Sequence, residues 1–296
     1  MRSKFLIAAV LLCTMMSSLH AQYSLNFGSS GTVKMGDVLD MSGDFSISAW
    51  AYEGLGMIVY KRGTPNNYCG YMLHYENTNK YQFQIQEQHT SDGDIASADP
   101  VSGAWVHLVG VFDAGNTLKI YKNGSLAATT NTDITTLTDN EAEFQIGKTE
   151  DTEIDEVAIW DTALSADAVA AIYNSGNGLN VSSNSGDYSS SSNLQGYWKF
   201  NEGSGSTAYD ETSNDYDGTI SGASWSTRVP FIESSTISSV ALASDNSTIA
   251  VTFNEAVYTT TDASSALVVG DFAFSISGGT ATLSSATPSS ISISGN

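Results

Sequence analysis

Two stretches decide the fold: FSISAWAY at residues 45–52 and YQFQIQEQ at residues 81–88. Apolar and polar side chains alternate in both, which is the period of a β-strand with one face in a core. In the second stretch, Tyr81, Phe83 and Ile85 fall on one face and a row of glutamines falls on the other. We therefore expect an antiparallel sheet with one core face and one solvated face.

Strand patterns continue further along the chain. Residues 105–112 are apolar at nearly every position, which predicts a central strand buried on both faces. Residues 118–126 predict a hairpin, because Asn123 and Gly124 can supply the two positive φ angles of a type I′ turn. The fold class predicted is therefore all-β.

One short helix interrupts the strand patterns. Ser165 can cap its start, and Asp167 lies in its first turn, where a negative charge is favourable. An apolar stripe at helical spacing follows, and Gly176 and Gly178 are expected to end the helix. We expect this helix to pack on the edge of a β-sandwich.

The first 21 residues have the composition of an export signal. Arg2 and Lys4 precede an apolar run, and Ala21 follows small and polar residues where cleavage is expected. The alternative is a membrane anchor, but the apolar run is shorter than the roughly 20 residues that a spanning helix needs. We therefore expect a secreted or cell-surface protein.

Charge limits the classes of partner that the chain can bind, and cysteine content limits its disulfides. The chain has 32 Asp and Glu against 11 Lys and Arg, for a net charge of −21. Such a chain is repelled by nucleic acid and by anionic membranes, so neither nucleic-acid binding nor membrane insertion is expected. Cys69 is the one cysteine after the leader, so no internal disulfide can form. The acidic excess suits either solubility alone or the binding of divalent cations.

Composition divides the rest of the chain. Residues 179–193 are mostly serine, asparagine and glycine, which is linker composition, and residues 194–230 form a compact segment with several aromatic side chains. Strand alternation resumes in residues 231–296, a unit shorter than the roughly 100 residues of an immunoglobulin-type sandwich. We expect this last unit to be truncated and the sequence to be part of a longer protein.

Three sets of residues share an order and spacing with one known family. They are LNFG (25–28) with FSISAW (45–50), WVHLV (105–109) with LKIYKNG (118–124), and FQIG (144–147) with IDEVAIW (154–160). Together they resemble the laminin-G-like, concanavalin A-like jelly-roll domains of bacterial extracellular proteins. The resemblance covers roughly residues 23–175, places a jelly-roll domain at residues 22–178, and implies an antiparallel two-sheet sandwich. Members of this family bind carbohydrates or proteins or act as spacers, and many hold calcium.

Two further segments resemble parts of such proteins. Residues 194–230 resemble the opening segment that full-length members carry before their first strand. Here the segment follows the domain, so we expect it to complete the first jelly roll in a circularly permuted order. The competing interpretation is the degenerate start of a lost repeat. Residues 231–296 are similar to bacterial immunoglobulin-like repeats.

The family resemblance also implies a structural calcium ion. Asp155 stands where relatives hold it, and backbone carbonyls near Gly28 at the end of the first strand can add ligands. The alternative for Asp155 is a solvated loop aspartate. Asp210, Asp215 and Asp217 form a second oxygen-rich loop, which either binds calcium or is only a turn, since aspartate favours turns without any metal.

Four side chains are candidates for binding a ligand: Tyr52, Tyr68, His74 and Tyr75. Flat rings stack on sugar faces, although aromatic residues in a sandwich also serve as core or turn residues. We expect a non-catalytic binding or adhesion module for an extracellular glycan or a surface protein. The alternative is a structural spacer in a long multidomain surface protein.

A hydrolase is the less favoured interpretation. Retaining β-glucanases of this fold use a Glu-x-Asp-x-Glu strand, in which the outer glutamates are the nucleophile and the acid/base. The stretch EIDE at 153–156 is similar, but Val157 stands where the second glutamate is required. Strict alternation would also turn Glu156 away from Glu153 and Asp155. We therefore expect no enzyme activity.

Overall fold

The computed structural model describes residues 22–52, 55–63, 69–76, 79–87, 93–150, 152–231, 237–242, 249–253 and 289–292. Gln22–Phe231 form one compact unit, and the residues from Ile232 onward belong to another. No helix in the described ranges has the length and apolar character needed to cross a membrane.

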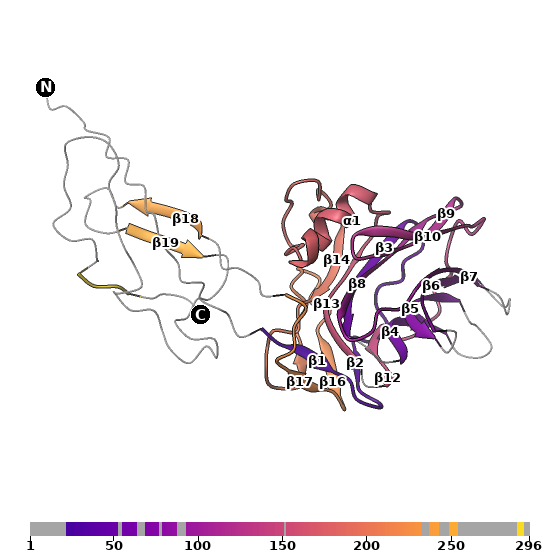
Figure 1. Ribbon diagram of the computed structural model, residues 1–296, viewed down its shortest axis with the longest axis horizontal. Helices are drawn as coiled ribbons and strands as arrows, with labels where there is room; N and C mark the ends of the chain where they lie inside the picture. Colours follow the sequence, from indigo (N-terminus) through magenta and orange to yellow (C-terminus); the bar gives the residue numbers. More distant parts are fainter. Residues whose placement is uncertain are drawn as a thin grey trace, which may run out of the picture. The chain divides into compact units, whose positions relative to one another are not determined.

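The first unit is a sandwich of two antiparallel sheets, as the sequence predicted (Figure 1). Sheet A has the order β10 (Ser125–Asn131), β9 (Thr117–Lys122), β8 (Trp105–Asp113), β3 (Phe45–Tyr52), β13 (Glu153–Trp160), β1 (Ser24–Asn26) and β17 (Ser224–Ser226), and β14 (Leu194–Trp198) also pairs with β13. Sheet B has the order β15 (Thr207–Ala208), β16 (Gly218–Ser221), β2 (Thr32–Lys34), β11 (Gln145–Gly147), β4 (Leu55–Arg62), β5 (Gly70–Glu76), β6 (Lys80–Gln86) and β7 (Asp94–Ala98), and β12 (Thr149–Glu150) pairs with β4.

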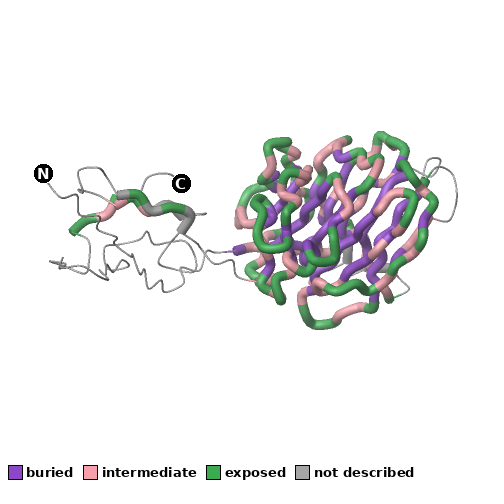
Figure 2. Tube along the Cα trace, turned by 90° about the horizontal axis from the view of Figure 1, so that it is seen from above, coloured by how far each residue is buried: buried purple, intermediate pink, exposed green. Residues whose placement is uncertain are grey.

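The core between the sheets is built from side chains that alternate along the strands. Phe45 lies within it, with ring centroids 4.8 Å from Tyr71, 5.8 Å from Phe83 and 5.5 Å from Phe112. These four rings are almost fully buried, and each contributes about 1.5–3 kcal/mol by leaving water. The core face predicted for residues 81–88 is therefore confirmed. Figure 2 shows the buried strands running through the unit and the exposed loops around them.

The predicted hairpin joins β9 to β10. Asn123 has φ 49° and Gly124 has φ 74°, the two positive angles of a type I′ turn. Lys122 pairs with Ser125 across the turn. The Asn-Gly pair thus sets the register at this end of sheet A.

The helix α1 (Ala166–Tyr173) covers part of the outer face of sheet A (Figure 1). Ser165 Oγ accepts a hydrogen bond from the Ala168 N–H at 3.1 Å, so the predicted cap is present. The helix ends before the predicted glycines, because Asn174 adopts the left-handed conformation and closes it. Short 3₁₀ turns follow at Asn174–Gly176 and Ser191–Asn193. A second apolar cluster fills the space between the helix and the sheet: Val109, Val111, Tyr121, Ala158, Trp160, Leu164, Ala168, Val169, Ile172, Val181, Tyr188 and Tyr197.

Residues 194–230 contribute strands to both sheets. β14 pairs with β13, β17 pairs with β1, and β16 pairs with β2. Trp198 and Phe200 are fully buried between the sheets, and Trp198 stacks on Phe144 at 5.4 Å. Tyr197 lies in the cluster under the helix. The β1–β17 pair brings the start and the end of this unit onto neighbouring strands.

The described part of the second unit contains one antiparallel strand pair. β18 (Ile237–Leu242) pairs with β19 (Ile249–Phe253), and the register shifts once within β18. Strand alternation was expected in both stretches, so this pairing agrees with the sequence. The immunoglobulin-like topology of the unit stays a prediction.

Candidate ligand-binding face

A bulge in β4 decides which of its side chains point away from the core, onto the outer face of sheet B. The register of β4 against β5 shifts between Met57 and Val59, so Ile58 and Val59 both lie in the core. Such a bulge re-aims the residues that follow it. Tyr60 and Arg62 therefore face away from the core.

Three cross-strand rows make up the surface that we call the polar face. The rows are Met57, His74, Gln82 and Ser97; Lys34, Gln145, Tyr60, Met72, Gln84 and Ile95; and Arg62, Gly70 and Gln86. Neighbours in a row are paired directly on adjacent strands, so their side chains lie about 5 Å apart. None of these residues is a carboxylate, although the chain has 32.

The centre of the polar face is buried, so the solvated face expected from the sequence is wrong here. Gln82 is 7% exposed, Gln84 9% and Gln86 1%. Their strand, β6, lies between β5 and β7 in sheet B. Tyr60 and Arg62 at the margin are half-buried. The face therefore combines a polar, buried centre with an accessible rim.

Two buried polar atoms at this centre have no hydrogen-bond partner: His74 Nε2 and Gln82 Oε1. The two residues are paired directly across β5 and β6. The Gln82 amide nitrogen donates to Ser97 Oγ at 3.4 Å, so its carbonyl oxygen is the group left over. Burial and the nearby charge of Arg62 lower the pKa of His74 to about 4, so the ring is neutral at physiological pH. A buried polar atom without a partner costs about 1–3 kcal/mol, which a polar ligand or water can remove.

An aromatic ring and two cations flank this centre. The Lys148 ammonium lies 5.8 Å from the centroid of the Tyr60 ring. Arg62 donates a hydrogen bond from Nη2 to Gln86 Oε1. Together with the amides and the neutral imidazole, these groups provide donors, acceptors and one flat surface on the same side of sheet B.

The structure places one of the four predicted ligand-binding residues, His74, on the polar face. Tyr75, the next residue, turns inward and packs against the core. Tyr52 lies on β3 of sheet A, where the Arg228 guanidinium is 4.3 Å from its ring centroid. Tyr68 lies outside the described residues. The described members of this set are therefore not gathered into one site.

Sequence reasoning missed Tyr60, Gln82 and Gln84 as site residues. The signal for the glutamines was present, because they alternate with core residues in 81–88, but it predicted solvent contact only. No sequence pattern announced the bulge at Met57 that fixes the direction of Tyr60.

Gly28 and Asp155, two of the predicted calcium ligands, lie apart. In the antiparallel β1–β13 ladder, Asn26 pairs with Glu153. Gly28 follows Asn26 along the first chain segment, whereas Asp155 lies in the opposite direction from this pair, beside the start of β1. β1 ends at Asn26, and Gly28 follows it in a turn with φ 50°. Asp155 is 3% exposed, and its Oδ1 accepts the Glu156 N–H at 3.0 Å. The strand pairing therefore does not place these two residues opposite each other.

Asp210 and Asp217 are hydrogen-bonded to each other, and both carboxylates hold a loop in place. Asp217 Oδ1 accepts the Asp210 N–H at 2.9 Å. The Asp210 carboxylate accepts backbone N–H groups from both sides of the loop: Tyr197 at 2.9 Å, Thr212 at 3.0 Å and Tyr216 at 3.0 Å. Asp215 is exposed on the same loop with φ 54°. The donors already bonded to Asp210 do not fit a calcium ion at that carboxylate.

A different acidic cluster surrounds a buried lysine. Asp37, Asp40 and Asp139 each place a carboxylate oxygen within 4.8 Å of the others. Lys61 is 1% exposed, and its ammonium lies 2.8 Å from Asp37, 2.8 Å from Asp40 and 2.7 Å from the Ala142 carbonyl oxygen. The lysine itself supplies the positive charge that this cluster needs.

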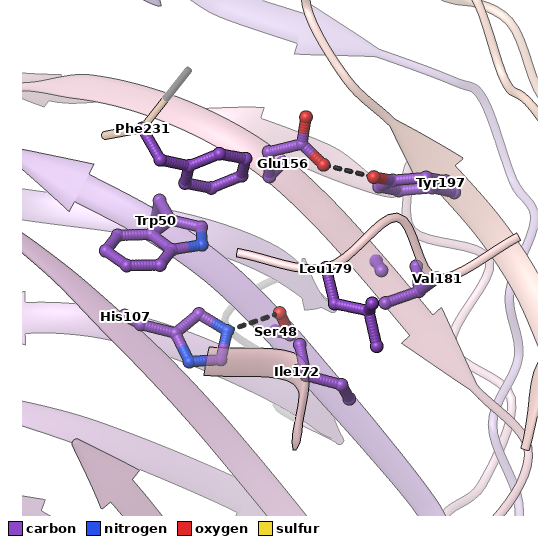
Figure 3. A pocket seen from close by; sticks show the side chains of 10 residues that line it. Ser48, Trp50, His107, Glu156, Ile172, Leu179, Val181, Tyr197 and Phe231 are labelled. Atoms are coloured by element: carbon purple, nitrogen blue, oxygen red, sulfur yellow. Dashed lines mark hydrogen bonds between the residues drawn. The ribbon is translucent and has the colours of Figure 1, made fainter. Parts of the chain in front are cut away.

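A small cavity lies between sheet A and the helix (Figure 3). His107 Nε2 lies 3.1 Å from Ser48 Oγ, while its Nδ1 is buried without a partner. The Trp50 ring lies between His107 at 5.0 Å and Phe231 at 5.4 Å (Figure 3). The cavity volume is about 10 Å³, room for one water, so it cannot hold a sugar.

A second bulge corrects the face expected for Glu156. The register of β13 against β3 shifts between Asp155 and Ala158, and Glu156 has φ 50°. Glu156 consequently lines the small cavity and accepts a hydrogen bond from the Tyr197 hydroxyl (Figure 3). It shares the outer face of sheet A with Asp155, so strict alternation is wrong at this position. Val157 is fully buried in the core between the sheets.

Comparison with protein families agrees with this architecture. Residues 27–170 match the family model Laminin_G_3, described as the concanavalin A-like lectin/glucanases superfamily. Residues 27–170 are therefore similar to concanavalin A-like domains, and a jelly-roll sandwich is consistent with this match. A search of curated proteins found no match.

Solved structures share the fold at low sequence identity. A "putative carbohydrate binding protein" from Bacteroides ovatus ATCC 8483 is 16% identical with a TM-score of 0.52, covering 70% of this chain and 60% of that one. The binding domain of Paraclostridial Mosquitocidal Protein 1 is 14% identical with a TM-score of 0.41, covering 54% and 47%. A SAP-like pentraxin from Limulus polyphemus is 14% identical with a TM-score of 0.39, covering 52% and 82%. The chain spans less than two thirds of the first two structures.

Proposed function

We propose that the sandwich is a non-catalytic module that binds glycans on the polar face of sheet B. The observation that supports this proposal is the pair of buried, unpartnered atoms, His74 Nε2 and Gln82 Oε1. A sugar hydroxyl both donates and accepts hydrogen bonds, so it can pair with either atom. Ligand binding then removes a cost that the free protein bears.

The middle row of the polar face suits a chain of sugars. It crosses six strands of sheet B, a distance of about 24 Å. Tyr60 offers a ring for stacking, Gln145 offers an amide beside it, and Gln84 offers another amide two strands away. The Bacteroides ovatus protein with the same fold is described as carbohydrate binding, which favours a glycan ahead of a protein ligand.

The glutamates of β13 support a non-catalytic role. Glu153 is bonded by Arg228 at 3.2 Å, and Glu156 by the Tyr197 hydroxyl. Both lie on sheet A, whereas the polar face belongs to sheet B. A hydrolase of the β-glucanase type needs two carboxylates facing one bound sugar, and Val157 is buried in the core instead of facing one.

Replacing Gln82 with leucine is expected to weaken glycan binding at least tenfold. Leucine has a similar size but can bond neither to a sugar hydroxyl nor to Ser97, and sites built on buried hydrogen bonds discriminate strongly. Tyr60→Ala is expected to weaken binding by a similar factor through the loss of stacking. A glycan array with the full chain identifies the ligand, and titration calorimetry measures the affinities.

The matched control is Tyr209→Ala, because Tyr209 is an aromatic residue that is 56% exposed and lies outside the polar face. This variant should bind like the unmodified protein. Unchanged affinity of Gln82→Leu, or an array without any bound glycan, would argue for the spacer role instead. Laminarin, lichenan and agarose should show no new reducing ends after incubation with the protein.

Structural calcium stays a prediction, now centred on Asp155 alone. An ion that binds only the folded state raises its stability by mass action, so millimolar calcium is expected to raise the melting temperature by about 3 °C. EDTA should reverse the shift, and Asp155→Ala should abolish it, whereas Asp210→Ala should keep it. Identical melting temperatures in calcium and in EDTA would refute calcium binding.

A further inference from the structure

We propose that the glycan bound by the polar face is acidic and carries carboxylate or sulfate groups. This inference rests on the proposed function and names the ligand class of the same site. It comes from the distribution of charge over the sandwich, which the following contacts describe.

The polar face collects positive charge in a strongly acidic chain. Lys34 lies within the middle row, which continues to Thr219, and Arg62 lies at the margin of the third row; none of the residues named in the three rows is a carboxylate. The chain as a whole has a net charge of −21. Charges beyond about 8 Å are screened at physiological salt, so the charges beside this face determine which ligand it accepts: Lys34, Arg62, Lys148 and the Glu143 carboxylate paired with Lys34.

Lys148 is the cation best placed to bind an acidic group of a ligand. Its backbone is fixed, because the Lys148 N–H donates to the Gly31 carbonyl oxygen at 2.8 Å. Its side chain is exposed, and the ammonium lies 5.8 Å from the Tyr60 ring centroid. An exposed cation–π contact is worth only about 0.5–1 kcal/mol, whereas an acidic group adds a charge-assisted hydrogen bond. A sugar seated at Tyr60 thus places its acidic group beside Lys148.

Lys34 can also bind an acidic group of the ligand, because little stability is lost when its present ion pair is broken. Its ammonium lies 2.7 Å from Glu143, and both side chains are 46% exposed. Exposed pairs of this kind contribute about 0–1 kcal/mol, so an acidic ligand can displace Glu143. The middle row then contains one cation, Lys34, and passes a second, Lys148, at Tyr60.

Titration of the full chain with three polymers tests the inference: dextran, dextran sulfate and polygalacturonate. At 150 mM salt we expect one acidic polymer to bind at least tenfold more tightly than neutral dextran, and the advantage should shrink in 1 M salt. Dextran sulfate and polygalacturonate distinguish a preference for sulfate from a preference for carboxylate. Lys148→Gln should reduce the advantage at least threefold, and Lys148→Arg should preserve it.

Lys119→Gln is the matched control, because it makes the same charge change on the opposite sheet, where Lys119 pairs with Val111 of the cluster under the helix. This variant should leave the preference unchanged. Equal loss in Lys119→Gln and Lys148→Gln overturns the inference, since only net charge would then matter. Equal binding of neutral and acidic glycans overturns it and leaves the proposed function standing. Binding of no glycan in the array or among these polymers overturns both.

Discussion

Replacing Trp198 with alanine is expected to lower the free energy of unfolding by about 3–5 kcal/mol, the range for truncating a buried aromatic side chain. Trp198 is fully buried, stacks on Phe144 at 5.4 Å, and donates from its indole nitrogen to the Tyr216 carbonyl oxygen at 3.0 Å. Its removal leaves a cavity between the sheets and a carbonyl oxygen without its donor. Urea denaturation followed by circular dichroism measures the change as a shift in midpoint.

Trp225→Ala is the control within the same segment. Trp225 is only half-buried and donates to the Gly205 carbonyl oxygen at 3.2 Å, so we expect a loss of about 1–2 kcal/mol. A chain that ends at Gly178 should bind a dye for exposed apolar surface, because it lacks β14 to β17. Equal midpoints for Trp198→Ala and the unmodified protein would contradict the place of this segment in the core.

Acidification from pH 7 to pH 5 is expected to cost the sandwich about 2 kcal/mol through His107 alone. Burial lowers the pKa of His107 to about 3, against about 6.5 in the unfolded chain. Between these values the unfolded chain binds more protons, so stability is complete above pH 6.5 and falls by about 1.4 kcal/mol per unit below it. Midpoints of urea denaturation at pH 5, 6 and 7 measure the slope.

His107→Gln isolates this contribution, because glutamine is polar and does not titrate. The variant should be less stable at pH 7, yet lose about 2 kcal/mol less than the unmodified protein on going to pH 5. His74, whose pKa is lowered to about 4, adds a slope of the same sign, which His74→Gln should remove. The raised pKa of the buried Glu202 acts in the opposite direction, and both variants retain it. Parallel slopes in His107→Gln and the unmodified protein would rule out His107 as the source.

The sequence predicts the sandwich well because its strands are regular over most of their length. Alternation placed Phe83 and Ile85 in the core, Asn123-Gly124 set a hairpin, and Ser165 capped the one α-helix of the described residues. Each of these signals is local, depending on side-chain period or on allowed φ angles. The end of the helix escaped prediction because asparagine can adopt the left-handed conformation that was expected of glycine.

The candidate site was predicted poorly because it depends on bulges and on burial. A bulge in β4 turns Tyr60 outward, and one in β13 turns Glu156 to the face of Asp155. One extra residue in a strand reverses the inward and outward alternation of the residues that follow. No local sequence pattern predicts where such a bulge occurs. The burial of Gln82 was missed because a glutamine that alternates with core residues is expected to face solvent. Of the three predicted ligand residues that the structure describes, His74 alone lies on the polar face.

The antiparallel pairing of β1 with β17 determines how the first unit meets mechanical tension. Ser24 pairs with Ser226, and Ser24 Oγ also donates to the Arg228 carbonyl oxygen at 2.7 Å, so the chain enters and leaves this unit at one corner. A pull on the two ends therefore loads the backbone hydrogen bonds of this strand pair one after another, as in a zipper. The polar face lies on sheet B, to which neither strand belongs, and is outside the path of that load.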